Sequence, residues 1–148
     1  MAKRDIVKDG DPLLRKTSRE VTAFDARLGH ILDDMVETMV AAEGVGLAAP
    51  QIGLLRRFAV CQMTSGEIIE LINPKLLEGD GKALLNEGCL SVPGKYMQVP
   101  RFAHIKLAYQ NRNGESVERD FFDFDARVCQ HEMDHLDGIL FYDKAVKQ

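Results

Sequence analysis

Two histidines spaced four residues apart near the end of the chain place the strongest constraint on what this sequence can form. They are His131 and His135, and Glu132 directly follows the first of them. On an α-helix, residues four apart lie one turn above each other, so both imidazoles face a common point. Glu132 lies about 100° further round the helix axis, where it can border a metal ion without binding it. The segment therefore predicts a helical site for a divalent metal ion, with a carboxylate placed to take a proton from a bound water.

A catalytic metal ion needs a third protein ligand and one open coordination position. Only two aspartates follow the histidine pair, so we expect the third ligand to come from upstream, where Cys89, Cys129 and His104 are the candidates. Cys129 lies two residues before His131 and points about 160° away from it, which favours a buried apolar role. His104 lies in a predicted strand without a neighbouring ligand and is expected to be an ordinary histidine. Cys89 follows Gly88, whose missing side chain allows a close approach, and we select Cys89.

The composition describes an ordinary soluble protein and excludes several functional classes. The 148 residues fit one domain, expected over residues 1–148, with 45% hydrophobic and 28% charged residues. A net charge of −4 without a basic run argues against a nucleic-acid-binding protein. An odd number of cysteines indicates reduced thiols. Since the sequence has neither a secretory signal nor an apolar run long enough for a membrane span, we expect a cytoplasmic location and no membrane partner.

The spacing of apolar residues predicts a helix towards each end of the chain. Apolar residues recur every three or four positions from Asp25 to Glu43, with Asp25 as N-cap and Gly44 as the stop. A second helix is expected over Asp123–Leu136, with Asp123 or Asp125 as its N-cap.

Strands are predicted between the two helices. They are expected at Arg57–Met63, at Glu67–Ile72, around Ile105–Tyr109 and at Ser116–Phe122. Asn73-Pro74 is expected to end the second strand, and Glu78–Gly81 to form a turn. The last two strands flank the turn Asn111–Gly114, so we expect them to pair as an antiparallel hairpin. The sequence thus predicts an α+β domain with short strands between a long N-terminal helix and the metal-binding helix.

Three separated segments carry a closer resemblance. Gly44–Gln51, Glu87–Ser91 and Gln130–Leu136 resemble, in this order, the three motifs of the peptide deformylase family. Ile72–Pro74 and Val99–Arg101 agree with the flanking sequence, and the resemblance covers nearly the whole chain. It implies a hydrolase that removes the formyl group from the N-terminal formylmethionine of newly synthesised proteins. It also implies a fold in which antiparallel strands surround the central metal-binding helix.

The resemblance assigns roles to individual residues. The metal ligands would be Cys89, His131 and His135, with Glu132 as the catalytic carboxylate. The side chain of Gln51 and the backbone N–H of Leu90 would stabilise the oxyanion. Further implied residues are Gly46 against the substrate backbone, Val45, Leu90 and Val128 in the wall of a methionine pocket, and an ion pair of Glu87 with Arg101. For Val45 and Val128, plain core packing is an equal alternative, and the sequence leaves open whether Arg127 faces substrate or solvent.

The resemblance also implies a cofactor and partners. The cofactor would be one divalent metal ion, Fe²⁺ in cells, which Zn²⁺, Ni²⁺ or Co²⁺ can replace. The substrates would be N-formylmethionyl nascent polypeptides in a cytoplasm of the bacterial type. A transient ribosome contact is a further implication, although the longer C-terminal helix of some members is missing from this sequence.

The chemistry follows from these parts. A metal ion lowers the pKa of its bound water, in favourable cases to about 7, which makes hydroxide available for attack on the formyl carbon. Glu132 would accept the released proton and pass it to the departing amine. Two alternatives use the same helix: a zincin-type metallopeptidase, which needs a downstream third ligand, and a non-catalytic metal-stabilised domain, which needs a fourth.

Overall fold

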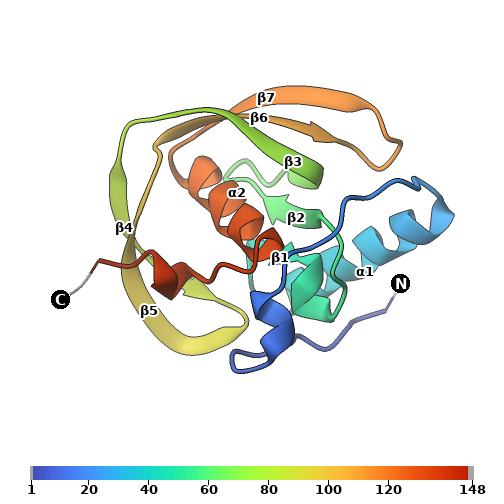
Figure 1. Cartoon of the computed structure of the whole chain (residues 1–148), viewed down its shortest axis with the longest axis horizontal. Coiled ribbons are helices and arrows are strands. Elements are labelled where there is room, and N and C mark those ends of the chain that lie inside the picture. Colours follow the sequence, from blue (N-terminus) through green and yellow to red (C-terminus); the bar gives the residue numbers. More distant parts are fainter. Residues whose placement is uncertain (1, 147–148) are drawn as a thin grey trace.

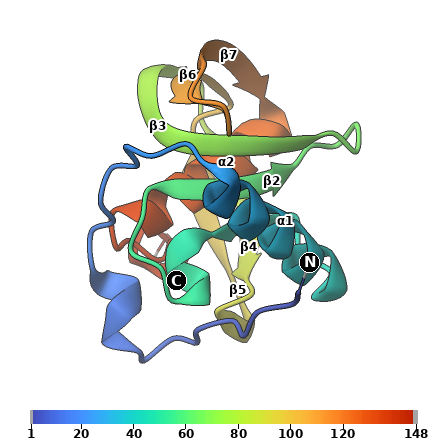
Figure 2. The ribbon, with the colours of Figure 1, turned by 90° about the vertical axis from the view of Figure 1, so that its right-hand side faces the viewer.

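In the computed structural model, which describes residues 2–146, two helices lie on opposite faces of an antiparallel sheet. The helices are α1 (Ala26–Ala41) and α2 (Asp123–Leu136). Figure 1 shows α2 in the middle of the molecule, with strands around it. Figure 2, turned by 90°, shows α1 on the near side of the sheet and α2 behind it. This arrangement confirms the predicted α+β class with a central second helix.

The strands form two separate sheets. The larger sheet has the order β1-β2-β3-β6-β7, with every neighbouring pair antiparallel, and the smaller one pairs β4 with β5. The strand bounds are Gly46–Ala48 (β1), Phe58–Gln62 (β2), Ile68–Asp80 (β3), Ala83–Cys89 (β4), Val92–Arg101 (β5), His104–Gln110 (β6) and Ser116–Phe122 (β7). Three short 3₁₀ helices complete the fold: η1 (Pro12–Arg15), η2 (Ala49–Ile52) and η3 (Phe141–Asp143).

Burial on both faces explains the apolar run at the start of β2 and the neighbouring apolar residues Leu71 and Ile72 of β3. Successive strand residues point to opposite faces of a sheet. In β2, Phe58 and Val60 pack in the cluster with α1, whereas Cys61 packs in the cluster with α2. In β3, Ile72 belongs to the α1 side and Leu71 to the α2 side. The sheet thereby separates two hydrophobic cores, and α2 is held by one of them.

The two helices begin differently. The Asp25 side chain caps α1 by accepting from the Leu28 backbone N–H at 3.0 Å, as predicted. At the other end the helix stops at Ala41, because Glu43 takes a φ of 60° one position before the expected stop. The bounds of α2 agree with the prediction, but its N-cap does not. Phe122 holds that position without a side-chain bond, while the Asp125 carboxylate accepts from the Thr64 backbone N–H at 2.8 Å and anchors the β2–β3 turn.

The prediction for the strands was wrong at one end of β3. Asn73-Pro74 does not end this strand. Asn73 takes a φ of 51°, and its side chain forms hydrogen bonds with the Val21 backbone and with the Gln110 side chain. The chain then resumes pairing with β6 as far as Asp80, which lies opposite His104. Of the expected turn at Glu78–Gly81, the first three residues therefore belong to a strand of 13 residues, which is not short, and only Gly81, with a φ of 70°, follows its end. The strands β1, β4 and β5 were not predicted.

None of the helices in residues 2–146 is long and apolar enough to cross a membrane.

Candidate metal centre and its cavity

Three potential ligands from two elements meet beside α2. His131 and His135 come from successive turns of this helix, and Cys89 is the last residue of β4. One ligand atom from each residue lies within 4.8 Å of the others. The Cys89 Sγ lies 3.3 Å from His135 Nε2, and the two imidazole rings have centroids 5.1 Å apart. A thiolate and two imidazoles are a donor set that suits Zn²⁺ and related ions, with one coordination position left open.

The far side of His131 is held by a buried carboxylate. Its Nδ1 lies 2.8 Å from Glu87 Oε1. Since the ionised Glu87 can only accept, this bond keeps a proton on Nδ1 and makes Nε2 the nitrogen that a metal ion would bind in place of a proton. Burial by itself raises the pKa of Glu87, but hydrogen bonds from Arg101 and His131 outweigh it and lower this pKa to about 2. Glu87 is therefore a carboxylate throughout the physiological pH range.

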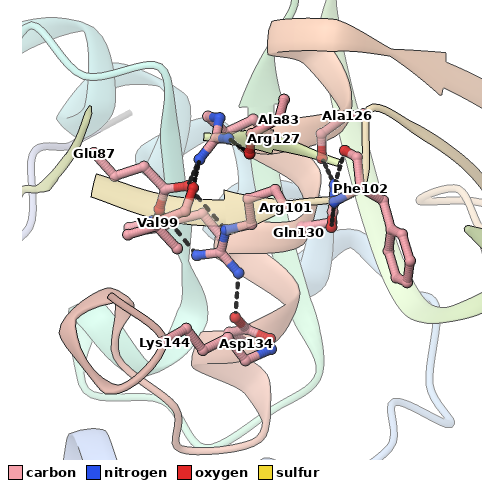
Figure 3. Close-up of polar contacts among 11 residues, drawn as sticks. Ala83, Glu87, Val99, Arg101, Phe102, Ala126, Arg127, Gln130, Asp134 and Lys144 are labelled. Carbon is pink, nitrogen blue, oxygen red and sulfur yellow. Dashed lines mark hydrogen bonds and ion pairs between the residues drawn. The ribbon is translucent and has the colours of Figure 1, made fainter. Parts of the chain in front are cut away.

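The predicted ion pair of Glu87 with Arg101 is present and belongs to a larger network. Arg101 donates from Nε and Nη2 to the two Glu87 oxygens at 2.8 and 2.9 Å. It also bonds to Asp134 at 2.5 Å. Arg127 adds a further bond to Glu87, and Figure 3 shows these side chains converging between α2 and β5. The guanidinium of Arg127 is thus buried against Glu87, although the residue also lines the neighbouring cavity, and sequence reasoning missed this role.

Glu132 lies next to the ligand cluster with one oxygen free. Its side chain is buried, and within residues 2–146 the Oε1 atom has no hydrogen-bond partner. Burial raises the pKa of this carboxyl to about 7. The side chain fits because Gly46 of β1 faces it: a Cβ at this position would lie 2.2 Å from Glu132 Oε2. A buried carboxyl with a pKa near neutrality is suited to accept and return a proton.

The electrostatics around the cluster favour a cation. Burial by itself lowers the pKa of His131, but the charges of Glu132, Cys89 and Glu87 raise it to about 10. Burial lowers the pKa of His135 below its usual value, so this ring is neutral, the form that binds metals. Its Nδ1 is buried and unpaired among the residues that the structure describes. A negative field beside a neutral imidazole fits a divalent metal ion.

The side chain of Gln51, in η2, also contacts the ligand cluster. Its Oε1 accepts from the Ala48 backbone N–H at 2.9 Å. Its Nε2 donates to Ser91 Oγ at 3.1 Å and to Cys89 Sγ at 3.6 Å. Because the carbonyl end is held, the amide N–H₂ has to point towards the cluster. Sequence reasoning also missed Ser91, whose Oγ accepts this bond from Gln51.

A cavity of about 560 Å³ opens beside the cluster. Its lining includes every predicted site residue except His135: Val45, Gly46, Gln51, Cys89, Leu90, Val128, His131 and Glu132. Val128 is buried and packs in the core on the α2 side, so it serves both core and cavity. Val45 is 42% exposed, which excludes plain core packing for this residue.

The rejected ligand candidates lie elsewhere. Cys61 and Cys129 are both buried in the core on the α2 side, where Met133 also packs. His104 bonds to Asp120 at 2.7 Å and to Asp80 at 3.3 Å, away from the cluster. The reason for choosing Cys89 needs one correction: Gly88 makes room for the ring of Tyr96, which would lie 2.5 Å from a Cβ there.

Comparison with known proteins identifies the family of the chain. The model of the family described as polypeptide deformylase matches residues 3–148. The peptide deformylase of Alkaliphilus metalliredigens is 49% identical over 148 residues, which are 100% of both chains. Among solved structures, the peptide deformylase from Thermotoga maritima has a TM-score of 0.96 at 42% identity, covering 99% of this chain and 100% of that one. A Met-Ala-Ser-bound class I type b peptide deformylase from Acinetobacter baumannii has a TM-score of 0.91 at 34% identity, covering 96% and 98%. The chain therefore belongs to the polypeptide deformylase family, the hydrolases that remove the N-formyl group from newly made polypeptides.

Proposed function

We propose that this chain carries out deformylation at the cavity beside α2, with Cys89, His131 and His135 holding one divalent metal ion. The observation that carries the proposal is the convergence of these three donors next to the buried carboxylate of Glu132, whose Oε1 has no partner among the described residues. A bound divalent metal ion lowers the pKa of a water molecule and so supplies a nucleophile at neutral pH. The remaining steps belong to side chains of the protein.

Glu132 would move the proton. Hydrolysis of a formamide adds one water across the C–N bond and yields formate and a free amine. The water must lose a proton when its oxygen attacks the formyl carbon, and the amine must gain one when it departs. Glu132, with a pKa raised by burial to about 7, can do both in turn. Its Oε1 is free for this purpose, because none of the described residues bonds to it.

Gln51 and Leu90 would stabilise the oxyanion. Attack places negative charge on the formyl oxygen, and donors that are already oriented lower the barrier most. Gln51 meets this condition because its Oε1 is held by the Ala48 N–H. Leu90 follows Cys89 directly and lines the same cavity, so its backbone N–H is the proposed second donor. Removing one such donor typically costs about 3–4 kcal/mol of barrier.

The cavity wall supports a substrate with an N-terminal methionine. Val45, Leu90 and Val128 give it apolar surface beside the ligand cluster, and Gly46 leaves room along β1 for a peptide backbone. The Acinetobacter baumannii neighbour, solved with Met-Ala-Ser, is consistent with a product peptide of this kind. We infer that the side chain of formylmethionine occupies this apolar part of the cavity.

The finer assignments also belong to the proposal. Fe²⁺ is the proposed metal, with Zn²⁺, Ni²⁺ or Co²⁺ as substitutes, since thiolate and imidazole suit these ions. The proposed setting is the cytoplasm, with nascent chains as substrates and only a transient contact with the ribosome. The three free cysteines are in keeping with a reducing compartment.

A zincin-type metallopeptidase is not favoured by the downstream carboxylates. Asp137 bonds to Arg57 at 2.9 Å, and Asp143 forms an ion pair with Arg15. Neither carboxylate belongs to the group of possible ligand atoms, whereas Cys89 does, which supports Cys89 as the proposed third ligand. A purely structural metal site would leave Glu132 without a task.

The test compares Glu132→Ala with the wild-type protein, both purified without oxygen and analysed for metal. We expect Glu132→Ala to keep one metal ion per chain and to lose at least about 10²-fold in kcat for formyl-Met-Ala-Ser, the typical contribution of a general acid–base group. Glu118→Ala, which removes an exposed carboxylate on β7, is the matched control and should be unaffected. Full activity of Glu132→Ala would refute the mechanism, and a wild-type protein without bound metal would refute the site.

A further inference from the structure

The two parts of the ligand cluster are carried by elements that no strand pairing connects. Cys89 belongs to the β4–β5 sheet, whereas His131 and His135 belong to α2. In the described part of the chain, β4 and β5 pair only with each other and not with the five-stranded sheet. The separation between the Cys89 thiolate and the imidazoles therefore depends on how the β4–β5 hairpin is fixed to α2.

One face of α2 makes the polar contacts to this hairpin. Arg127, His131 and Asp134 follow each other at intervals of four and three residues, which places them on one side of the helix. His131 bonds to Glu87 of β4, and Asp134 bonds to Arg101 of β5. Each of these contacts reaches one strand.

Arg127 differs because it bonds to both strands at once. Its Nη2 donates to the Ala83 carbonyl oxygen of β4 at 2.7 Å, and its Nη1 donates to the Val99 carbonyl oxygen of β5 at 2.8 Å. The same Nη1 donates to Glu87 Oε2 at 2.5 Å. Figure 3 shows the guanidinium reaching all three groups from α2. Only 3% of this residue is exposed, so water cannot replace these bonds.

The bond to Glu87 links Arg127 to the histidine ligand. Glu87 Oε2 accepts from Arg127 and Arg101, and Oε1 accepts from Arg101 and His131. With both oxygens engaged, the carboxylate has one orientation, and this orientation sets that of the His131 ring. The guanidinium groups of Arg101 and Arg127 also offset the charge of the buried Glu87 carboxylate.

We propose that Arg127 is a positioning residue that sets the distance between Cys89 and the two histidines, and with it the affinity for the metal ion. The inference rests on the proposed metal site. Arg127 acts through two contacts: it seats the β4–β5 hairpin on α2, and it orients the Glu87 carboxylate that holds His131. Lysine has no planar fork of donors, so it cannot make all three bonds.

The test measures Co²⁺ binding, because Arg127 also lines the cavity and activity alone would mix the two effects. Co²⁺ affinity is determined without oxygen by competition with a chelator, and the thiolate-to-cobalt absorption band reports the bond to Cys89. We expect Arg127→Met to bind Co²⁺ about 10–100-fold more weakly, as is typical for loss of a group that supports a ligand, and to shift the band. Arg127→Lys should recover part of the affinity. Arg119→Met, which removes a half-exposed arginine on β7, should bind as the wild type does.

The possible results separate this inference from the proposed function. If the wild type binds no Co²⁺, both are wrong. If Arg127→Met shows wild-type affinity and an unshifted band, only the positioning role is wrong, even when its thermal stability has fallen. Should Arg127→Met not fold, Arg127→Lys decides: weaker binding supports the role, and wild-type binding refutes it. Finally, the loss caused by Arg127→Lys should be smaller in a Glu87→Gln background, since additive losses would exclude the route through Glu87.

Discussion

At the scale of single residues, the site depends on a side chain that is missing. Gly46 lies on β1 opposite Cys61, and its Cα faces the Glu132 carboxylate. The resemblance to deformylases placed this glycine against the substrate backbone. The structure adds a second reason for it, because any Cβ at position 46 would overlap the Glu132 carboxylate. The position of Glu132, the proposed proton carrier, is therefore linked to a glycine of the neighbouring strand.

Gly46→Ala should impair catalysis while the metal remains bound. A Cβ at 2.2 Å from Glu132 Oε2 forces the carboxylate or the strand to move. A misplacement of about 1 Å near a reacting centre can cost about 10²-fold in rate, so we expect a loss of that order in kcat/KM for formyl-Met-Ala-Ser. Gly29→Ala is the control, since its Cβ would meet only the end of the Arg112 side chain, at 3.4 Å. Unchanged kinetics of Gly46→Ala would contradict the proposed position of Glu132.

At the scale of elements, a histidine at the start of β6 connects this strand with its two neighbours in the large sheet. His104 opens β6 and bonds to Asp80 of β3 and to Asp120 of β7. Its ring also stacks on Phe122, with centroids 4.7 Å apart. The bonds to Asp120 and Asp80 raise the pKa of His104 above its usual value. His104, a candidate metal ligand by sequence, thus links β6 to β3 and β7 through its bonds to two aspartates.

The raised pKa gives the element a defined pH dependence. A histidine whose pKa is higher in the folded protein stabilises it at low pH, fully below the unfolded pKa of about 6.5, and this contribution is lost as pH rises through the folded pKa. We expect an NMR titration to place the pKa of His104 above 6.5, and Asp120→Asn to lower it. A wild-type pKa at or below 6.5 would contradict the hydrogen bonds of His104 to Asp120 and Asp80.

At the scale of the whole molecule, the metal site joins parts that are far apart in the chain. Cys89 lies in the small sheet and both histidines lie in the last helix, so one bound ion would connect the two. A ligand that binds only the folded state stabilises it by mass action. The metal should therefore matter for the stability of the molecule as well as for the reaction.

Removing the metal should lower the free energy of unfolding. At a free metal concentration 100 times the Kd, the expected loss on chelation is about 2.7 kcal/mol. Cys89→Ser should reduce this metal-dependent part, whereas Cys129→Ser, in the core on the α2 side, should retain it. Urea unfolding with and without chelator measures the difference. If the two cysteine variants behave in the opposite way, the ligand has been assigned to the wrong cysteine.

Local patterns were sufficient for a large part of this structure. The helical period determined α2 over Asp123–Leu136, and with it the common direction of the two histidines. Strand patterns were sufficient for β2 and β7 because burial alternates or is continuous over short runs. The family motifs added the remaining site residues, and all of them except His135 line one cavity. Each of these inferences depends on neighbours within a few positions along the chain.

Only the tertiary structure decided the pairings and hydrogen bonds between residues that lie far apart in sequence. β4 and β5 carry few buried apolar residues, so their pairing leaves a weak periodic signal. Asp125 looks like a helix cap in sequence, but it bonds to Thr64, which is brought to it by the fold. Arg127 looks like a charge near a pocket, but carbonyl groups of two strands and Glu87 surround it. The sequence by itself therefore determined the helix that carries His131 and His135, and its motifs named Cys89 as the proposed third ligand. The tertiary structure determined how the hairpin bearing Cys89 is held against that helix. The physical reason is that a buried charge must lie where other groups can pair with it and hydrogen-bond to it.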